Sequence, residues 1–267
     1  MSDYSTATTI NESLEQIGLH REEITSIIQS LPEDTLALML YGSRARGDFV
    51  DSSDFDILRL CQRDFPTKKF GRVSISSYTH QQLESATGTL FGTHLKRDGR
   101  AIFDPSSQLS NIVSNLQPAI PADLLRRVRR YSQILGVSEA EAHEYYPGLV
   151  RLGRYLLRTA IYAQALELGR PCFSVRELAK RFEKPELETL LASDPDVTGP
   201  PSLALMAELR DRLKETVGEP PPIPFQTLAA LATHKWDTDR SMAALAIRAA
   251  SEDGESLDYS DLPKVLL

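Results

Sequence analysis

Two pairs of residues in the first quarter of the chain have the chemistry to handle phosphate and a metal ion. Gly42 and Ser43 follow a short apolar run, and Asp54 and Asp56 come after ten intervening residues. A glycine lets backbone N–H groups approach a bound anion, and a serine hydroxyl adds a further donor. Strand alternation would place both carboxylates on one face, with Phe55 on the other. Two carboxylates on one face suit Mg²⁺.

Two arginines, Arg44 and Arg46, lie between these pairs. Guanidinium groups grip phosphate oxygens with two parallel hydrogen bonds, which a lysine ammonium cannot copy. The segment therefore combines groups suited to a triphosphate with groups suited to its metal ion. The plainer interpretation is a turn of solvated Arg and Asp residues between two strands.

The spacing of Gly42-Ser43 and Asp54-x-Asp56 between two apolar runs resembles the signature of the DNA polymerase β-like nucleotidyltransferase superfamily, especially its minimal branch. The resemblance covers about the first 110 residues. It implies transfer of a nucleoside monophosphate from an NTP, with ATP as the expected nucleotide, to a hydroxyl acceptor. It also implies that Mg²⁺ is held by Asp54 and Asp56, and that the phosphates are bound by Gly42, Ser43 and Arg44 or Arg46.

One departure from the family pattern concerns the next predicted strand, Arg72–Tyr78. Active members usually carry a third carboxylate there, whereas this chain offers Ser74 and Ser76. A neutral serine is a poor Mg²⁺ ligand and no general base at neutral pH. Asp98 or Asp104 would substitute only if the fold brings one of them in. Two functions stay open: an active nucleotidyltransferase, and a degenerate protein that senses Mg·NTP or neutralises a partner, as an antitoxin would.

Apolar periodicity predicts the elements that would hold this site. We expect helical structure over Asn11–Ser30, with a break at Gly18 as an alternative, because glycine is disfavoured inside a helix. Turn residues separate short strand-like runs from helical segments through the first hundred residues. The expected strands are Leu36–Tyr41, Asp54 onward, Arg72–Tyr78 and Arg100–Phe103, and the expected helices are Thr79–Leu83 and Gly88–Leu95.

Strand-like alternation gives way to helical periodicity after Asp104-Pro105. The expected fold class is therefore α+β, with a small mixed β-sheet and flanking helices followed by an all-α helical bundle. The expected domains are residues 1–110 and 111–267. In the second, we expect helices over Ala122–Leu135, Ser138–Glu144 and Leu149–Leu168, and one that begins at Ser174.

The segment 148–182 shows a weaker resemblance to the helical bundles that accompany minimal nucleotidyltransferases. These include HEPN-type partners and the C-terminal substrate bundles of antibiotic nucleotidyltransferases. The ribonuclease form of HEPN needs an Arg four to six residues before a His. None of the five histidines of this chain has one, which disfavours a HEPN nuclease.

A row of arginines in the expected helix Leu149–Leu168 forms a second candidate for phosphate binding. Arg151, Arg154 and Arg158 follow one another at spacings of three and four, which places them on one helix face. We expect Arg154 and Arg158 to contact the triphosphate or an acceptor's phosphates. A solvated helix face is the alternative, since arginine is a good helix former.

A nucleotide contact is one interpretation of His94, but a partly buried structural histidine or a histidine at a helix end is favoured. The N-terminus has no basic and apolar signal pattern, and no apolar run is long enough to cross a bilayer. Two cysteines, Cys61 and Cys172, form no disulfide framework, so a reducing cytoplasm is expected.

A net charge of −7 argues against a protein coated with nucleic acid, but it leaves room for a local basic face. The acceptor stays open among a protein hydroxyl, an RNA end and a small molecule such as an aminoglycoside. The oligomeric state and membership of a toxin–antitoxin pair stay open as well.

Overall fold

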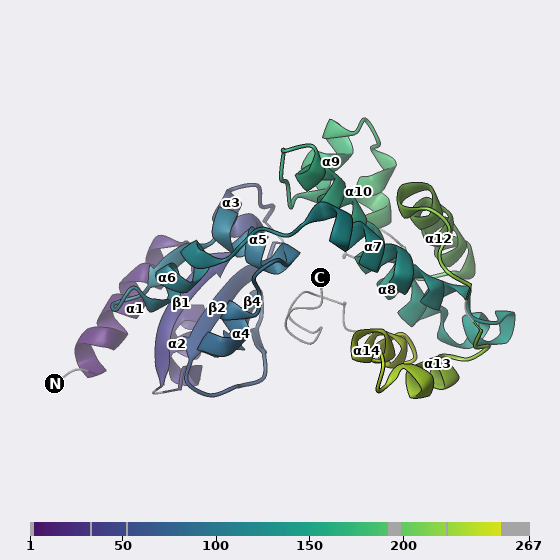
Figure 1. The fold of residues 1–267 in the computed structure, drawn as a ribbon. Helices are drawn as coiled ribbons and strands as arrows, with labels where there is room; N and C mark the ends of the chain where they lie inside the picture. Colours follow the sequence, from purple (N-terminus) through teal and green to yellow (C-terminus); the bar gives the residue numbers. More distant parts are fainter. Residues whose placement is uncertain (1–2, 33, 52, 192–198, 223, 252–267) are drawn as a thin grey trace. The chain divides into compact units, whose positions relative to one another are not determined.

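The computed structural model describes residues 3–32, 34–51, 53–191, 199–222 and 224–251 (Figure 1). Contacts divide these residues into two compact units, of which one ends at Ala119 and the other begins at Ile120. The domain boundary expected after residue 110 falls inside helix α6 (Gln108–Asn115). The buried side chains of α6 belong to a core cluster on the sheet of the first unit.

The first unit is built on a five-stranded mixed sheet, which confirms the α+β class. Its order is β3-β4-β2-β1-β5. The pair β2–β4 is parallel, and the pairs β1–β2, β1–β5 and β3–β4 are antiparallel. The strands are β1 (Thr35–Tyr41), β2 (Phe55–Cys61), β3 (Lys68–Phe70), β4 (Val73–Tyr78) and β5 (Arg100–Phe103).

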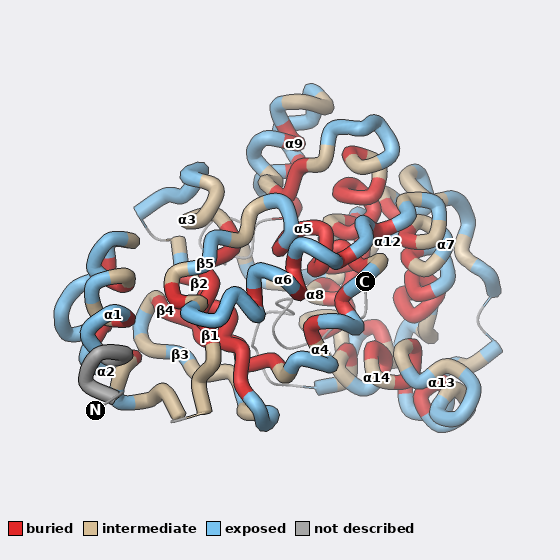
Figure 2. Tube along the Cα trace, turned by 60° about the vertical axis from the view of Figure 1, so that its left-hand side comes forward, coloured by how far each residue is buried: buried red, intermediate tan, exposed pale blue. Residues whose placement is uncertain are grey.

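Helices cover both faces of this sheet, which explains why β1 and β2 read as near-continuous apolar runs. One face packs with α1 (Asp3–Gln16) and α2 (Arg21–Ser30). The opposite face packs with α4 (His80–Glu84), α5 (Leu90–Asp98) and α6. Figure 2 shows the result as buried central strands beneath helices whose outer turns are exposed.

The N-terminal helical segment differs from the continuous alternative. Gly18 separates α1 from α2 with a φ of +91°, a left-handed conformation that glycine adopts at little cost. The helix α1 also begins at Asp3, well before the expected start of helical structure at Asn11. Side chains of α1 such as Leu14 are fully buried against the sheet, so packing stabilises this helix beyond its own propensity.

The described part of the second unit is helical. Its longest element, α8, joins the two helices expected over Ser138–Glu144 and Leu149–Leu168. Pro147 lies inside α8, and Tyr145 departs from helical dihedral angles, so the gap expected between the two helices is a kink within one helix. The elements are α7 (Pro121–Tyr131), η1 (Ser132–Gly136), α8 (Glu139–Glu167), α9 (Val175–Arg181), α10 (Glu186–Leu191), α12 (Leu203–Val217), α13 (Leu228–Lys235) and α14 (Arg240–Ala249).

The helices of the second unit pack through apolar faces. Residues of α8 such as Leu149, Leu152 and Leu156 are fully buried, as are Leu209 of α12 and Leu245 of α14. Within the described ranges, no helix has both the length and the apolar character needed to traverse a bilayer.

Candidate functional site

Gly42, from the Gly-Ser pair, and Asp56, from the Asp pair, lie next to each other where β1 ends. Tyr41, the last residue of β1, pairs with Asp56 of β2, and the short helix α3 (Gly42–Arg46) begins at the next residue. Gly42 has a φ of +74°. A β-carbon placed on it would lie 2.3 Å from the Asp56 Oδ2 atom, far inside any van der Waals contact. Only glycine therefore allows this carboxylate to lie against the start of α3.

Asp54 and Asp56 differ in their surroundings. Phe55 is buried in the core formed with α1 and α2, as its predicted position on the other face requires. Asp56 is half-buried in β2, whereas Asp54 is exposed and precedes the strand. Strand alternation therefore fixes the face of Asp56, and the loop before β2 sets the position of Asp54.

The strand register distinguishes the two serines of β4. Ser74 is the parallel partner of Asp56, so the two side chains lie side by side on one face of the sheet. Ser76 instead pairs with Leu58, is fully buried, and has a hydroxyl without a hydrogen-bond partner among the described residues. Of the two serines, Ser74 is thus the one that lies beside Asp56.

The two alternative carboxylates, Asp98 and Asp104, both contact groups of their own chain. Asp104 accepts hydrogen bonds from the backbone N–H groups of Leu109 and Ser110, at 3.3 and 2.8 Å, and so stabilises the first turn of α6. Asp98, at the end of α5, lies 3.3 Å from Arg97. Within the described ranges, no group of three or more His, Cys, Asp or Glu residues has the arrangement of a metal site.

Arg44 organises the loop that leads to Asp54. Its guanidinium donates hydrogen bonds to the carbonyl oxygen of Ser53, at 3.0 and 3.2 Å, and to that of Asp51, at 3.2 Å. The same group lies 4.1 Å from the ring centroid of Phe49 and 4.4 Å from that of Phe55. Two aromatic contacts and three hydrogen bonds hold the loop to α3 and to the first residue of β2.

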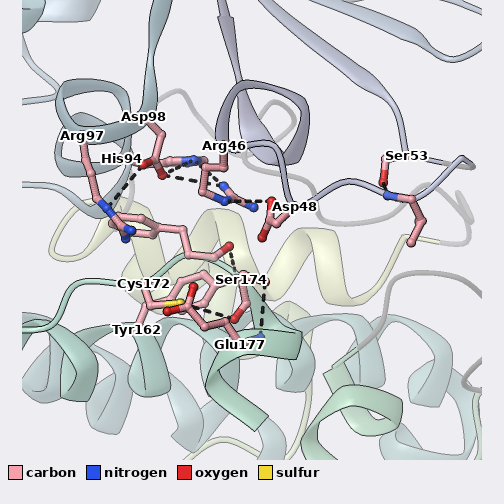
Figure 3. A network of polar contacts seen from close by, with 12 residues as sticks. Arg46, Asp48, Ser53, His94, Arg97, Asp98, Tyr162, Cys172, Ser174 and Glu177 are labelled. Atoms are coloured by element: carbon pink, nitrogen blue, oxygen red, sulfur yellow. Dashed lines mark hydrogen bonds and ion pairs between the residues drawn. The ribbon is translucent and has the colours of Figure 1, made fainter. Parts of the chain in front are cut away.

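Arg46 belongs to a polar network between α3 and α5 (Figure 3). Its Nη1 atom lies 2.9 Å from His94 Nε2 and 3.8 Å from Asp98 Oδ2, and its Nε atom lies 3.2 Å from Asp48 Oδ1. Burial first of all, together with the positive charges of Arg46 and Arg97, lowers the pKa of His94 to about 3. The imidazole is therefore neutral at pH 7 and accepts the hydrogen bond from Arg46.

The arginine row of α8 contacts backbone carbonyls within the second unit. Arg154 Nε donates to the carbonyl oxygen of Leu190 at 3.1 Å, and Arg158 Nη2 donates to that of Leu191 at 2.5 Å. These carbonyls end α10, where helical backbone oxygens lack partners within the helix. Burial lowers the pKa of Arg154, and the charge of Arg158 lowers it further.

The third member of the row, Arg151, has a similar partner. Its Nη2 atom donates to the carbonyl oxygen of Ser251 at 3.0 Å, just beyond the end of α14. The guanidiniums of all three arginines thus lie at the C-terminal ends of other helices, α10 and α14. A positive charge there also interacts favourably with the negative end of the helix dipole. The row combines the expected placement on one face with partners that the sequence pattern did not reveal.

The donor set fits one Mg²⁺ ion that arrives with a nucleotide. Magnesium in proteins is commonly held by one or two carboxylates together with substrate phosphates and water. Asp56 meets the first requirement beside Gly42, where the absent β-carbon leaves room for its carboxylate. Ser74 adds only a neutral oxygen beside it, so a second ion would lack a charged ligand on β4.

Comparisons with known proteins find distant similarity among solved structures only. No family model matches the chain, and no curated protein matches it. Among solved structures, a nucleotidyltransferase-like protein from Exiguobacterium sibiricum 255-15 is similar over 78% of this chain and 76% of that chain. The sequence identity is 16% and the TM-score is 0.31.

Proposed function

We propose that the first unit binds an NTP together with Mg²⁺, ATP in the first instance, and transfers the nucleoside monophosphate to a hydroxyl acceptor. The observation that carries this proposal is the contact between Asp56 and Gly42. A carboxylate lies where the β-carbon of any other residue would be, beside backbone N–H groups at the start of α3. This contact supports a common role for the two halves of the sequence pattern.

The residues take distinct roles in this proposal. Asp54 and Asp56 hold the metal ion, and Ser43 with the neighbouring backbone N–H groups binds the terminal phosphates. The metal, when bound, neutralises charge on the phosphates and makes the α-phosphorus open to attack. Arg44 and Arg46 support the site by holding α3 and its following loop, since their guanidiniums bind groups of the chain itself.

The transfer joins the acceptor oxygen to the α-phosphorus, and the bond to the β-phosphate oxygen breaks, so pyrophosphate leaves. The proton of the acceptor hydroxyl passes in this step to an oxygen of the departing pyrophosphate. The acceptor is a hydroxyl of a protein, of an RNA end or of a small molecule such as an aminoglycoside.

A second candidate function is binding of Mg·NTP without turnover, as in a sensor or an antitoxin-like partner. The specific observation in its favour is the register of β4, which places the neutral Ser74 beside Asp56. A serine hydroxyl can neither take the acceptor proton at neutral pH nor supply charge for a second ion. In this alternative the site keeps its affinity for the nucleotide complex and lacks transfer.

One measurement tests the site, and a second separates the two functions. Mg·ATP at a hundred times its dissociation constant should stabilise the parent protein by about 2.7 kcal/mol, and the double variant Asp54→Asn, Asp56→Asn should show no such stabilisation. Equal stabilisation of both proteins would refute the site assignment. Incubation with α-labelled NTPs and each acceptor class then tests for transfer, and label that appears with the parent but not with the double variant assigns the activity to this site.

A further inference from the structure

We propose that His94 is a positioning residue that fixes the turn Gly42–Arg46 by contacting both of its ends. The effect on nucleotide affinity rests on the function proposed above, whereas the effect on the turn itself does not. His94 lies in α5, which is buried over most of its length against the sheet, so the imidazole is carried by a rigid support.

The two contacts of His94 bracket the turn. On one side, its ring lies 6.2 Å from the ring of Tyr41 in an edge-to-face arrangement. Tyr41 is the residue before Gly42 and the sheet partner of Asp56. On the other side, His94 Nε2 accepts a hydrogen bond of 2.9 Å from Arg46, the last residue of α3. A single side chain thus touches the residues that precede and end the turn.

The charges around His94 explain why a neutral acceptor is needed there. Arg46 lies 3.2 Å from Asp48, and Arg97 lies 3.3 Å from Asp98, so two guanidiniums face two carboxylates (Figure 3). A protonated imidazole would add a third positive charge in a buried place and would lose its acceptor atom. The short distance of 3.4 Å between His94 and Asp98 is therefore a contact with a neutral ring rather than an ion pair at pH 7.

The turn depends on Arg46 because α3 is too short to be stable by itself. It has five residues, and its C-terminal end is closed by N–H groups of Gly47 and Asp48 that both bind the Ser43 carbonyl, at 2.9 and 3.2 Å. Loss of the His94 contact weakens the link between this guanidinium and α5, because the contact with Asp98 is longer, at 3.8 Å. The amides of Gly47 and Asp48 then report directly on opening of the turn.

The experiment compares His94→Leu, which removes the acceptor, with His94→Gln, whose amide oxygen can replace it. His80→Gln is the matched control, because this exposed histidine pairs with Glu84 away from α3. In the nucleotide-free proteins, hydrogen exchange of the Gly47 and Asp48 amides should be about tenfold faster in His94→Leu and near the parent rate in His94→Gln. Exchange of β2 amides should be unchanged in every variant.

The affinity for Mg·ATP, measured by calorimetry, should be about tenfold weaker in His94→Leu and near that of the parent in the other two variants. Equal exchange at Gly47 and Asp48 in His94→Leu and the parent would overturn the positioning role. Failure of His94→Gln to restore the slow rate would overturn it as well, in favour of simple packing. Should His94→Leu not fold, Arg46→Met removes the same hydrogen bond and is judged by the same rates. A parent without affinity for Mg·ATP would refute the proposed function, and the exchange rates would still decide the role of His94.

Discussion

The turn that carries Arg44 and Arg46 and the face of α8 that carries Arg154 and Arg158 look alike in sequence. Each holds closely spaced arginines with the geometry to grip phosphate. In the structure both pairs of arginines bind groups of their own chain, but they stabilise different features. The arginines of α3 hold a loop and a turn next to Asp56, whereas those of α8 close the end of α10. The first set can affect a ligand through the site it holds, and the second set stabilises a helix junction.

This difference shows what arginine spacing can predict. Spacing places a guanidinium on a face of an element, because that depends on local geometry. The partner depends on which carbonyl or carboxylate the fold brings near, and the carbonyl groups at a helix end are acceptors for a guanidinium just as phosphate oxygens are. Carboxylates at a fixed register with a glycine give a more specific signal, since the contact of Asp56 with Gly42 requires both residues.

The largest effect that tests this comparison is expected at Gly42. Gly42→Ala would force a β-carbon against Asp56 Oδ2 at a φ of +74°, which should destabilise the fold by about 2–4 kcal/mol and abolish Mg·ATP-dependent stabilisation. Gly47→Ala is the control, since Gly47 has a φ of +81° with nothing within 4 Å of the added atom. It should cost only about 1–2 kcal/mol, measured by chemical denaturation, and keep the response to nucleotide. Equal losses of stability and of nucleotide response in the two variants would show that Gly42 has no special role in the site.

The arginines of α8 should show the opposite profile. The double variant Arg154→Gln, Arg158→Gln removes two charged donors from the end of α10 and should lower the free energy of unfolding by about 1–3 kcal/mol. If these contacts are the whole role of the pair, the affinity for Mg·ATP and its salt dependence stay at the parent values. Weaker nucleotide binding with unchanged stability would instead restore the phosphate-binding interpretation of the row.

Much of the first unit could be predicted from the sequence because its signals are local. Apolar runs bounded by Gly, Pro and Asp indicated β1, β2, β4 and β5, and the helix expected over Thr79–Leu83 is present as α4, with Thr79 as its N-cap. The boundary of β2 was less accurate, since Asp54 lies in the preceding loop. The Arg44 clamp gives the physical reason: its hydrogen bonds to Ser53 and Asp51 hold that loop outside the strand ladder.

The network around His94 could be predicted only in part. A partly buried structural histidine was the favoured interpretation, and the structure agrees. Its partner Arg46 lies 48 residues away, and the partner of Arg154 lies 36 residues away. Contacts at such separations depend on how helices pack on a sheet or on one another, and a single sequence shows neither. A spacing of four between His94 and Asp98 on one helix face was the available signal.

The pH dependence of stability tests the neutral state of His94. Its pKa is about 3 in the folded protein against an ordinary value of 6.5, so the unfolded chain binds more protons between these values. Stability should therefore fall as the pH is lowered from 6.5 toward 3, by up to about 1.4 kcal/mol per pH unit from this group. The difference in unfolding free energy between the parent and His94→Gln, followed by urea titration at each pH, should shrink along that range. A difference that is constant with pH would mean that His94 titrates near its ordinary value.

The smallest effect is expected for Ser74→Asp. This variant also tests whether the site only binds Mg·NTP or transfers the nucleotide. Ser74 and Asp56 are register partners on adjacent parallel strands about 4.8 Å apart, so the new carboxylate would add the charged oxygen that β4 lacks. Ser74 is itself buried, so the new carboxylate is both desolvated and repelled by Asp56 in the metal-free protein. The variant should therefore be less stable than the parent without metal, and it should bind Mg²⁺ several-fold more tightly. Transfer from α-labelled NTP should rise if the missing carboxylate is what limits turnover.

Ser76→Asp is the matched control, since Ser76 pairs with Leu58 and is fully buried, so a charge there should unfold the protein without aiding the metal. A folded Ser74→Asp protein that binds Mg²⁺ more weakly than the parent would show that Asp56 does not hold the metal, because added negative charge at its register partner can only favour a cation bound between them.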